Sequence, residues 1–470
     1  MDAPLVTLPR KVEVINIGLP LFARSVADQG HPVQQVEWRI PAGGDHRAVA
    51  ALQVLYGPRA AAIDEANAEV VRRLDRGVPV LVDVATARDV VPDFGDRTVL
   101  HCGPPIDWAR VCDPLRRSIR AAVVAEGWAG DVAAAHRLLE DGAIRLEPAN
   151  HHHVVVPMAT AIGPSAPVFV VVNEEGGTRA FSPINQGPGD VAWFGRETDA
   201  AVERLRFLRD VAGPMLRWIV RRAGPIDVLS LASQGIQMGD DIHMRTQAAT
   251  NLLLRNLLPW IAEYDGPGRV EFARYVSGNH LFFLNLAMAA AKSLTLWAEQ
   301  VEGASIVTSM ARNGTDFGIR LPGSKRWYLA EAPPVEDALY YSGYGPQESA
   351  RDIGDSAVLE LVGLGGPAAA GSPAVAAFLG GTMRDAIRAT EEMAQICVGE
   401  SSRFKLPTLD NRGTPVGVDV RRVVELAIRP KINTGILHVS QGIGQVGAGV
   451  ATAPIGCFVD ALLALAGPGS

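Results

Sequence analysis

The chain has 470 residues, of which 48% are hydrophobic and 20% are charged, and its formal net charge is −7 at pH 7. This length exceeds the size at which a single hydrophobic core usually keeps growing, so we expect several domains. The acidic balance, without a lysine- and arginine-rich cluster, argues against nucleic acid or an anionic membrane as the main partner. A small metabolite or another protein is the expected partner.

The cysteines and the apolar segments indicate in which cellular compartment the protein is expected. Widely spaced cysteines without a CxxC pair indicate neither a zinc ribbon nor a disulfide framework; they are Cys102, Cys112, Cys397 and Cys457. The N-terminal segment lacks the long apolar stretch of a secretory signal. The most apolar run, 281–297, contains Asn285 and Lys292 and is typical of a buried helix rather than a membrane span. We therefore expect a soluble cytoplasmic protein.

The first 115 residues predict alternating strands and helices. The strands lie at 12–18, 33–38, 78–84 and 98–102, with helices at 21–29 and 60–75. This alternation predicts an α/β fold that opens with a Rossmann-like domain, built on a parallel sheet, over residues 1–115. The first turn contains Gly18 but not the repeated glycines of a dinucleotide fingerprint, so we expect no nucleotide cofactor.

Residues 116–225 predict a helix followed by a mixed β domain that contains three consecutive histidines. If these residues form a strand, His151 and His153 point one way and His152 points the other way. The run could hydrogen-bond to substrate, hold a metal with a third ligand such as His243, or be structural; no HxxxH or HExxH spacing supports the metal. Asn185, in a later glycine loop, is either a turn former or an amide ligand.

Residues 226–300 predict a helical region that carries many polar side chains. If 237–251 is helical, Gln237, Asp241 and Arg245 lie on one line, and Asp240 and His243 lie beside it. A solvated face with an Asp241–Arg245 pair, worth about 0.3–0.5 kcal/mol, explains the same spacing. In the following helix, which Ser277 or Asn279 could cap, Asn285 and Lys292 share one face. A buried lysine is costly unless it is paired or functional.

Residues 301–470 predict an α+β domain with glycine-rich loops. Arg312 precedes Asn313-Gly314, the commonest hairpin turn, and its planar guanidinium could grip a phosphate or carboxylate there. Gly442, Gly444 and Gly447 formally satisfy GxGxxG, but too few residues follow for a complete βαβ unit. We expect this glycine loop to open the last helix and to offer N–H groups to an anion.

Several of these segments together resemble one family. INIGLPLFA, HCGPPI, the triple histidine, NQG, QMGDDIHMR, GNHLFFLNLAMAAAK, MARNGTDFGI, DIGDSA, INTGI and GIGQVGAG are similar to the YlbE/AllG-like family, whose members occur beside FdrA-type proteins. The similarity spans almost the whole chain, and its motifs are specific as a set. The chain departs from the family pattern at Met244, where Asn is usual, and at His280-Leu281, where Asp-His is usual.

The resemblance implies an oxamate carbamoyltransferase subunit. Such an enzyme exchanges carbamoyl phosphate and oxamate for oxalurate and phosphate in allantoin degradation. It implies a small anionic substrate, an FdrA-type protein subunit as partner, and a homo-oligomer or hetero-complex. We expect no cofactor and no metal.

This chemistry suggests roles for the residues above. The hypothetical catalytic residues are His243 as base, Asp240 to orient it, Arg312 for the anion and Asn313 for the oxyanion. The hypothetical substrate-binding residues are His151, His152, His153, Asn185, Gln237, Asp241, Arg245, Asn279, Asn285, Lys292, Gly442, Gly444 and Gly447. Two alternatives stay open: a metal-dependent amidohydrolase-like enzyme acting on a ureido or cyclic amide, and a non-catalytic subunit of an FdrA-type complex.

Overall fold

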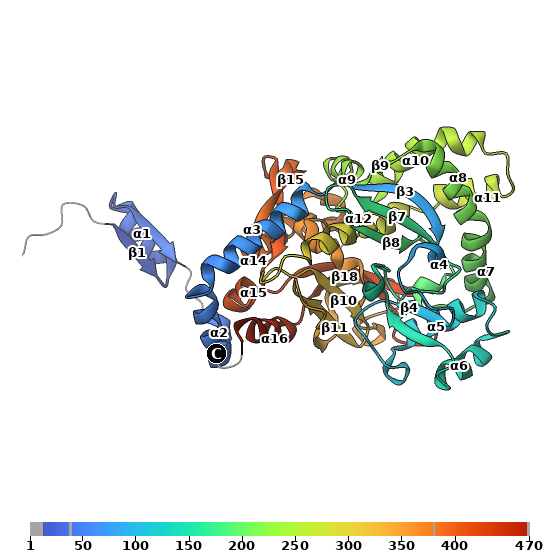
Figure 1. Ribbon diagram of the computed structural model, residues 1–470. Coiled ribbons are helices and arrows are strands. Elements are labelled where there is room, and N and C mark those ends of the chain that lie inside the picture. The colour runs from blue at the N-terminus through green and yellow to red at the C-terminus, as the bar shows by residue number, and fades with distance from the viewer. Residues whose placement is uncertain (1–12, 37–39, 379–380, 468–470) are drawn as a thin grey trace, which may run out of the picture.

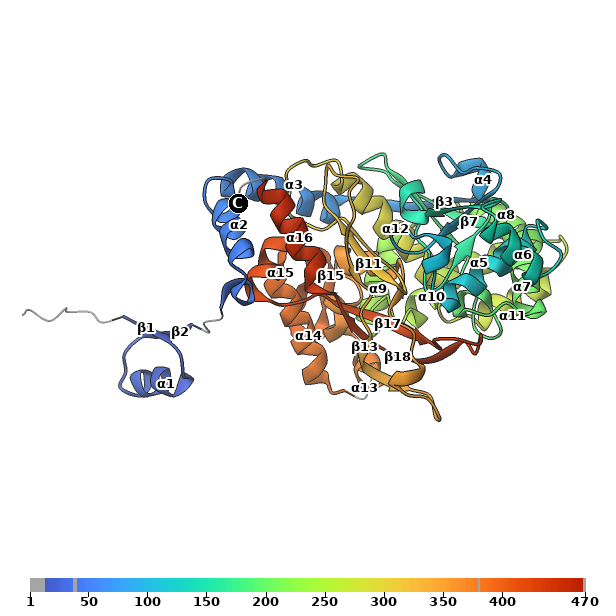
Figure 2. The same ribbon diagram turned by 90° about the horizontal axis from the view of Figure 1, so that it is seen from below.

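A single buried helix, α12 (Phe282–Ala298), runs through the middle of the molecule (Figures 1 and 2). The computed structural model describes residues 13–36, 40–378 and 381–467. Every residue of α12 except Trp297 is buried, because the helix is apolar on all sides and must be covered on all sides. Over the described residues no single helix is long and apolar enough to cross a membrane; α12 and its neighbour α11 (Arg269–Ser277) pass that test only as a pair bent by 80°.

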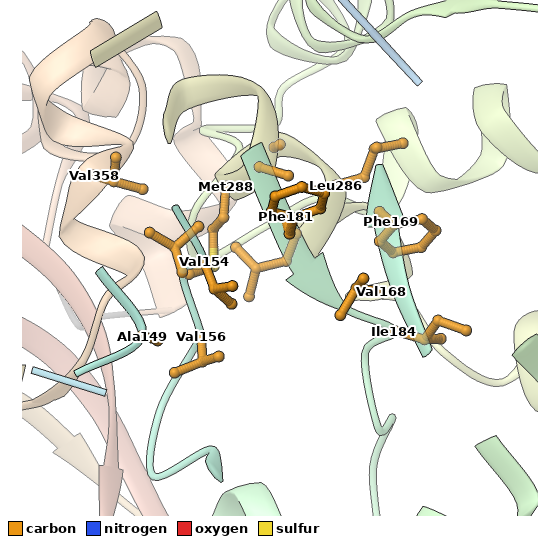
Figure 3. Packing of buried hydrophobic residues seen from close by; sticks show 14 of the residues in the cluster. Ala149, Val154, Val156, Val168, Phe169, Phe181, Ile184, Leu286, Met288 and Val358 are labelled. Carbon is orange, nitrogen blue, oxygen red and sulfur yellow. The ribbon is translucent and has the colours of Figure 1, made fainter. Parts of the chain in front are cut away.

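One antiparallel sheet packs directly on α12. Its strand order is β8-β7-β3-β9, with β3 (Pro79–Thr86), β7 (Pro167–Asn173), β8 (Arg179–Pro183) and β9 (Ile226–Asp227). Phe169 of β7 lies edge-on to Phe282 of α12, with ring centroids 6.0 Å apart. Figure 3 draws Phe169 and Phe181 of this sheet in one core with Leu286 and Met288 of α12. The strands come from three of the segments expected as separate domains, so those segments share one sheet and one core.

The expected parallel sheet over residues 1–115 is not formed. β1 (Val14–Ile17), α1 (Pro20–Asp28) and β2 (Val33–Val36) make the predicted parallel β-α-β unit, which stands apart from the rest in Figures 1 and 2. Its sheet has only those two strands in the described part of the chain. β3 joins the sheet on α12, and β4 (Thr98–His101) pairs with β5 (Arg145–Pro148) and β6 (Ala161–Ile162). The α/β character is correct, but a Rossmann-like domain is not confirmed.

The helices between these strands follow their sequence signals closely. α2 (His46–Tyr56) begins after Asp45, whose carboxylate accepts the N–H groups of Arg47 and Ala48. α3 (Ala60–Arg76) matches its predicted range. The single helix expected at the start of the 116–225 segment is two helices, α5 (Asp113–Ala125) and α6 (Val132–Glu140), because Gly127 takes a left-handed conformation between them (φ +76°). α7 (Asp199–Phe207) continues through a π-helical turn into α8 (Gly213–Ala223).

The C-terminal half contains two further sheets and a two-stranded ribbon. The first sheet has the order β12-β11-β10-β14, with β10 (Ser309–Asn313), β11 (Asp316–Arg320), β12 (Tyr328–Glu331) and β14 (Ile353–Gly354). The second has the order β13-β18-β17, with β13 (Val335–Tyr340), β17 (Lys431–Leu437) and β18 (Gln445–Thr452). β15 (Cys397–Leu406) and β16 (Arg412–Val418) form the ribbon. The hairpin predicted at Asn313-Gly314 is confirmed, since β10 pairs with β11 across that turn.

Helices of the C-terminal half enclose a second apolar core. The helices of this half are α13 (Pro373–Phe378), α14 (Met383–Ile396), α15 (Val420–Leu426) and α16 (Ile455–Ala466), of which α14, α15 and α16 contribute to this core. Apolar side chains of α2, α15 and α16 pack there with those of β11, β17 and β18. The larger core surrounds α12.

Two expected elements that carried site residues have a different structure. The segment 237–251 is not one helix: α9 (Val228–Gln237) ends at Gln237 and α10 (Gln247–Glu263) begins at Gln247. Gly239 and Ile242 both have positive φ, which interrupts the helix. The glycine loop does not open the last helix, because Gly442 and Gly444 lie in the turn between β17 and β18, and Gly447 lies within β18.

Candidate functional site

The loop between α9 and α10, residues 238–246, is organised around the carboxylate of Asp241. Its oxygens accept the backbone N–H groups of His243 (3.1 Å), Met244 (3.2 Å) and Arg245 (2.7 Å). The side-chain amide of Asn433 on β17 donates a fourth hydrogen bond, at 2.5 Å. The carboxylate is therefore fully used by the fold, and the expected helical pair between Asp241 and Arg245 is absent from this loop.

His243 faces a carboxylate that the sequence did not single out. Its Nδ1 lies 2.6 Å from Oε1 of Glu360, a residue with no exposed surface in a short turn at Glu360–Val362. The same oxygen accepts the N–H groups of Gly366 and Asn433, both at 3.3 Å. The expectation that Asp240 orients His243 is wrong, because the loop turns the imidazole toward Glu360. Since Nδ1 donates to the carboxylate, Nε2 is the ring atom left to accept a proton.

A glycine makes the His243–Glu360 pair possible. Gly365 has φ +63°, and a Cβ atom there would lie 2.1 Å from Oε1 of Glu360 and 3.0 Å from Nδ1 of His243. Any larger residue would push the two partners apart. The glycine-rich stretch 363–366 therefore has a packing role beside the imidazole.

Asp240 and Arg245 form the outer part of the same loop. Asp240 Oδ1 accepts from Arg245 at 2.7 Å, and Oδ2 accepts the N–H of Ala249 in the first turn of α10 at 2.9 Å. Burial raises the pKa of Asp240 to about 6, although these N–H bonds oppose the shift. The Arg245 side chain remains one third exposed. Gln237 is exposed at the end of α9 and lies off this network.

Arg312 and Asn313 hold the fold together and do not face an open site. Arg312 has no exposed surface and donates to Asp352 at 2.7 and 3.0 Å and to the Gly354 carbonyl at 2.7 Å. The guanidinium fork is occupied by this buried ion pair, so the expected grip on a substrate anion is not formed. Asn313 donates to the Pro104 carbonyl at 3.1 Å, and its oxygen accepts the N–H groups of the hairpin turn.

Three asparagines expected to bind substrate bind each other instead. Asn185 donates to Asn285 at 2.8 Å and accepts from Asn279 at 3.1 Å. Asn285 in turn donates to the Pro183 carbonyl at 2.7 Å, and all three residues are at most 1% exposed. This amide cluster joins the end of β8 to the start of α12. It shares no hydrogen-bond partner with His243 or Arg312, so these expected neighbours belong to separate networks.

The three histidines form a tight turn rather than a strand. A 3₁₀ turn at Ala149–His152 is followed by His153 in the left-handed region, with φ 60°. His152 is buried and lies 2.5 Å from Glu147 and 2.8 Å from the Pro92 carbonyl, so its role is structural. This turn, and not the alternation of a strand, leaves His151 and His153 exposed while His152 is buried.

His151 and His153 lie next to a group of charged residues around Lys292, which we name the lysine cluster: Lys292, Glu299, Ser309 and Arg320 with His151 and His153. Glu299 Oε1 lies 3.5 Å from Lys292 Nζ, 3.7 Å from Arg320 and 3.0 Å from the Ser309 hydroxyl that donates to it. Trp327 donates to Nε2 of His151 at 2.9 Å and lies under the Arg320 guanidinium. The cluster thus joins the end of α12, the β10–β11 hairpin and the histidine turn.

Charge and burial shift the pKa values in the lysine cluster. Burial lowers the pKa of Lys292 below its ordinary value, although Glu299 opposes the shift. Burial would raise the pKa of Glu299, but the charges of Lys292 and Arg320 lower it overall. Burial and the charge of Lys292 lower the pKa of His153, and burial and Arg320 lower that of His151. Both histidines are therefore neutral near pH 7.

The predicted glycine loop lies against arginines. A Cβ atom on Gly442 would lie 3.2 Å from Arg117, and one on Gly444 would lie 3.4 Å from Arg196. Arg196 donates to the Ile443 carbonyl at 2.8 Å. The turn that contains Gly442 and Gly444 therefore has arginines as neighbours. It does not begin a helix, so it does not present the expected row of free N–H groups to an anion. Within the described ranges, no three His, Cys, Asp or Glu side chains are arranged to hold a metal ion.

The comparisons with known proteins decide the family. The family model described as "Oxamate carbamoyltransferase subunit AllG" matches residues 144–356. The chain is 39% identical to the oxamate carbamoyltransferase subunit AllG of Escherichia coli K12 over 410 residues, which are 86% of this chain and 98% of that protein. The chain belongs to the AllG family.

Two further proteins are similar to this AllG-family chain over most of its length. It is 35% identical to the uncharacterized protein YahG of Escherichia coli K12 over 456 residues, which are 96% of each chain. A crystal structure of a conserved protein of unknown function from Enterococcus faecalis V583 has a TM-score of 0.84 and 36% identity, and it covers 86% of this chain and 97% of that one. The fold is therefore one already seen in a protein crystal.

The family match covers most residues of both candidate sites. His243 and the whole lysine cluster lie inside residues 144–356, whereas Glu360 and Asn433 lie outside. Sequence reasoning missed Glu299, Arg320 and Glu360. Glu299 had a signal, because it lies seven residues after Lys292 and so continues the Asn285–Lys292 spacing along one helix face. Glu360 had none, since it meets His243 from 117 positions away.

Proposed function

We propose that this AllG-family chain is a subunit of a carbamoyltransferase that moves a carbamoyl group between carbamoyl phosphate and a small amide such as oxamate. The name of the AllG relative, which is 39% identical, supports this reaction class. The observation that carries a catalytic role is the His243–Glu360 pair, in which a buried carboxylate holds Nδ1 at 2.6 Å. Such a pair leaves Nε2 as a base of fixed orientation.

The proposed step is an acyl transfer. The nitrogen of the acceptor amide attacks the carbamoyl carbon, a C–N bond forms, the C–O bond to phosphate breaks and phosphate leaves. His243 Nε2 takes the proton that the attacking nitrogen loses. Glu360 touches no reacting atom in this scheme; it is a positioning residue that fixes the imidazole tautomer and orientation.

Arg245 is the proposed anion contact near this base. It lies two residues after His243, donates one N–H to Asp240 and is one third exposed. A partly exposed guanidinium beside the base suits a phosphate or carboxylate group. The fold uses the polar atoms of Arg312, Asn313 and Asn279. We therefore do not propose Arg312 for the anion, Asn313 for the oxyanion or Asn279 for substrate binding.

The proposed enzyme acts as a complex. The relative is named a subunit, and we propose that this chain works in the cytoplasm with at least one companion protein, of FdrA type by the family resemblance. A non-catalytic role in that complex is the competing function. The name of the AllG relative, which calls it a subunit, is compatible with this role as well. A non-catalytic role predicts that activity of the complex does not require His243.

The test is phosphate release from carbamoyl phosphate and oxamate, with the purified chain alone and with the proteins encoded beside its gene. His243→Gln is expected to lower kcat by about 10²- to 10⁴-fold, the usual contribution of a general base. Glu360→Gln should cause a smaller loss, because a neutral amide still bonds to Nδ1. His136→Gln is the matched control, since His136 of α6 lies outside the His243–Glu360 network: it pairs with Glu140 at 3.1 Å and packs against Trp108.

The outcomes separate the two functions. Turnover in the native complex that falls in the His243→Gln complex supports a catalytic role. Full turnover in the folded His243→Gln complex makes the chain a non-catalytic subunit, and absence of phosphate release from every native combination refutes the proposed reaction. Circular dichroism of each variant shows that the fold is retained.

A further inference from the structure

Lys292 is a buried cation that its surroundings do not satisfy. It has no exposed surface, and its ammonium group, which carries three N–H donors, has no hydrogen-bond partner among the described residues. Its nearest carboxylate oxygen, on Glu299, is 3.5 Å away. Glu299 is thus an ion-pair partner at long range, and it leaves the three N–H donors of Lys292 without a hydrogen bond. Native proteins rarely leave buried donors in this state.

The use of lysine at this position is unusual for this chain. Only five of its 44 basic residues are lysines, and the other four lie at positions 11, 325, 405 and 431. The fully buried cation Arg312 shows the usual solution here, because its guanidinium is saturated by Asp352 and Gly354. A compact ammonium that is left unsaturated instead resembles a point-charge binding group.

The lysine cluster has an excess of positive charge. Lys292 and Arg320 contribute two cations, and Glu299 contributes one anion that both cations share through the same oxygen. His151 and His153 are neutral near pH 7 because burial and these cations lower their pKa values. A small anion would therefore complete the charge balance.

The histidine turn carries the exposed members of the lysine cluster. His151 and His153 are exposed, whereas Lys292 beside them is buried. His153 has a left-handed backbone conformation, which costs a non-glycine residue about 1–2 kcal/mol. Two bonds hold it there, the N–H of Phe181 to the His153 carbonyl and the N–H of Val155 to the Phe181 carbonyl, both at 3.0 Å. Strain of this kind is concentrated at functional sites.

We infer that the lysine cluster binds a small oxyanion, a carboxylate or a phosphate, between the Lys292 ammonium, the Arg320 guanidinium and the imidazoles of His151 and His153. Lys292 and Arg320 supply the charge, and the neutral imidazoles supply hydrogen bonds. The lysine cluster shares no hydrogen-bond partner with the His243–Glu360 pair, and its occupancy does not depend on the proposed reaction.

Isothermal titration calorimetry of the native chain with inorganic phosphate and, separately, with oxamate tests the inference. Lys292→Met, which keeps the length and removes the charge, should weaken binding by about 10- to 100-fold, the equivalent of one charge-assisted hydrogen bond. Glu299→Gln should tighten it, because the site then lacks its competing carboxylate. Lys405→Met, a half-buried lysine of β15, is the control and should leave the affinity unchanged.

Affinity should also fall as the pH rises through the lowered pKa of Lys292, because the neutral amine that forms there must take up a proton before it can bind an anion. Burial favours the neutral amine of Lys292, and a bound anion favours its ammonium form. The charged and titratable groups that face Lys292 are Glu299 of the same helix, Arg320 of β11, Asp355 after β14, and His151 and His153 of the histidine turn. With only five lysines in the chain, ¹³Cε-lysine NMR can report the protonation of Lys292 directly.

The results for the two anions either identify the class of ligand or refute the proposed site. Binding of phosphate alone, of oxamate alone or of both in competition assigns the ligand class, provided that Lys292→Met weakens it. Native affinity in the folded Lys292→Met protein, or an unmoved Lys292 resonance at saturating phosphate and oxamate, overturns the inference. The thermal stability of Lys292→Met gives a second reading, because a binding lysine predicts an unchanged or higher Tm and a purely structural lysine predicts a lower one.

Discussion

Asp355 shows how a single buried carboxyl group connects distant segments. Oδ1 accepts the N–H of Gly103 at 2.8 Å, and Oδ2 accepts that of Val156 at 3.1 Å. Burial raises the pKa of Asp355 to about 7, although these bonds and the charge of Arg312 oppose the shift. The folded protein therefore keeps a proton on this group at pH values where the unfolded chain has already released it.

Asp355 gives a prediction for the pH dependence of stability. Between about pH 4 and pH 7 the folded state binds more protons at this group than the unfolded state, so its contribution to the free energy of unfolding falls as the pH rises. The fall is about 1.4 kcal/mol for each unit of pKa difference. Asp355→Asn cannot titrate and also loses one acceptor, so it is expected to be less stable than the native protein by an amount that shrinks from pH 4 to pH 7.

Urea unfolding at pH 4, 5.5, 7 and 8 measures this difference. Asp141→Asn, at an exposed position after α6, is the control and should run parallel to the native protein. A constant difference between the native protein and Asp355→Asn over this range would contradict a raised pKa for the buried carboxyl.

At the scale of elements, the β10–β11 hairpin is held by the loop that follows β4. Asn313 donates to the Pro104 carbonyl at 3.1 Å, and Cys112 contacts the Asn313 carbonyl at 3.3 Å. The hairpin was predictable, because Asn-Gly between strands is a local signal. The direction of its polar side chains was not, because the loop against which they pack lies about two hundred residues earlier in the chain.

Gly103 gives a prediction about this docking. It has φ +84°, and a Cβ atom there would lie 2.6 Å from the backbone nitrogen of Asn313. Gly103→Ala is expected to lower the free energy of unfolding by about 1–3 kcal/mol more than Gly127→Ala. Both variants place alanine in a left-handed conformation, but only the alanine at position 103 would clash with a neighbouring backbone atom. Gly127 has φ +76° and nothing within 4 Å of its Cβ position. If urea unfolding gave the same loss of unfolding free energy for both variants, the hairpin would be shown to move away from the added methyl group at no cost.

At the scale of the whole molecule, the chain combines two cores with a small separate unit. One core surrounds α12 and the other lies among the C-terminal helices and sheets. The β1-α1-β2 unit exposes five large apolar residues: Ile15, Ile17, Leu19, Leu21 and Phe22. Two parallel strands and one helix are below the size that is stable alone, so this unit adds little to the stability of the rest.

Removal of residues 1–39 is the prediction at this scale. The shortened chain is expected to unfold at the same Tm as the full chain, because the unit stands apart from both cores (Figure 1). It should also associate less in static light scattering, since the exposed apolar face is gone. A clear fall in Tm would show that the unit packs on the body of the protein.

The sequence by itself determined the local elements and the family. Periodicity located α3 and α12 and the strands β1, β2, β3 and β4, because helix and strand patterns depend on neighbours within a few residues. The motifs from the triple histidine to the final glycine loop identified the family as a set. The same signals placed β3 and β4 in one parallel sheet, where the fold gives each a separate sheet.

Only the tertiary structure decided which polar residues meet. It joined Glu360 to His243, Asp352 to Arg312 and Glu299 to Lys292, and it turned Asn185, Asn279 and Asn285 toward one another. Strand partners and ion-pair partners are chosen by the packing of segments far apart in the chain, and that choice depends on total burial rather than on local spacing. From the sequence one can predict that a buried charge needs a partner, but only the folded core determines which residue that partner is.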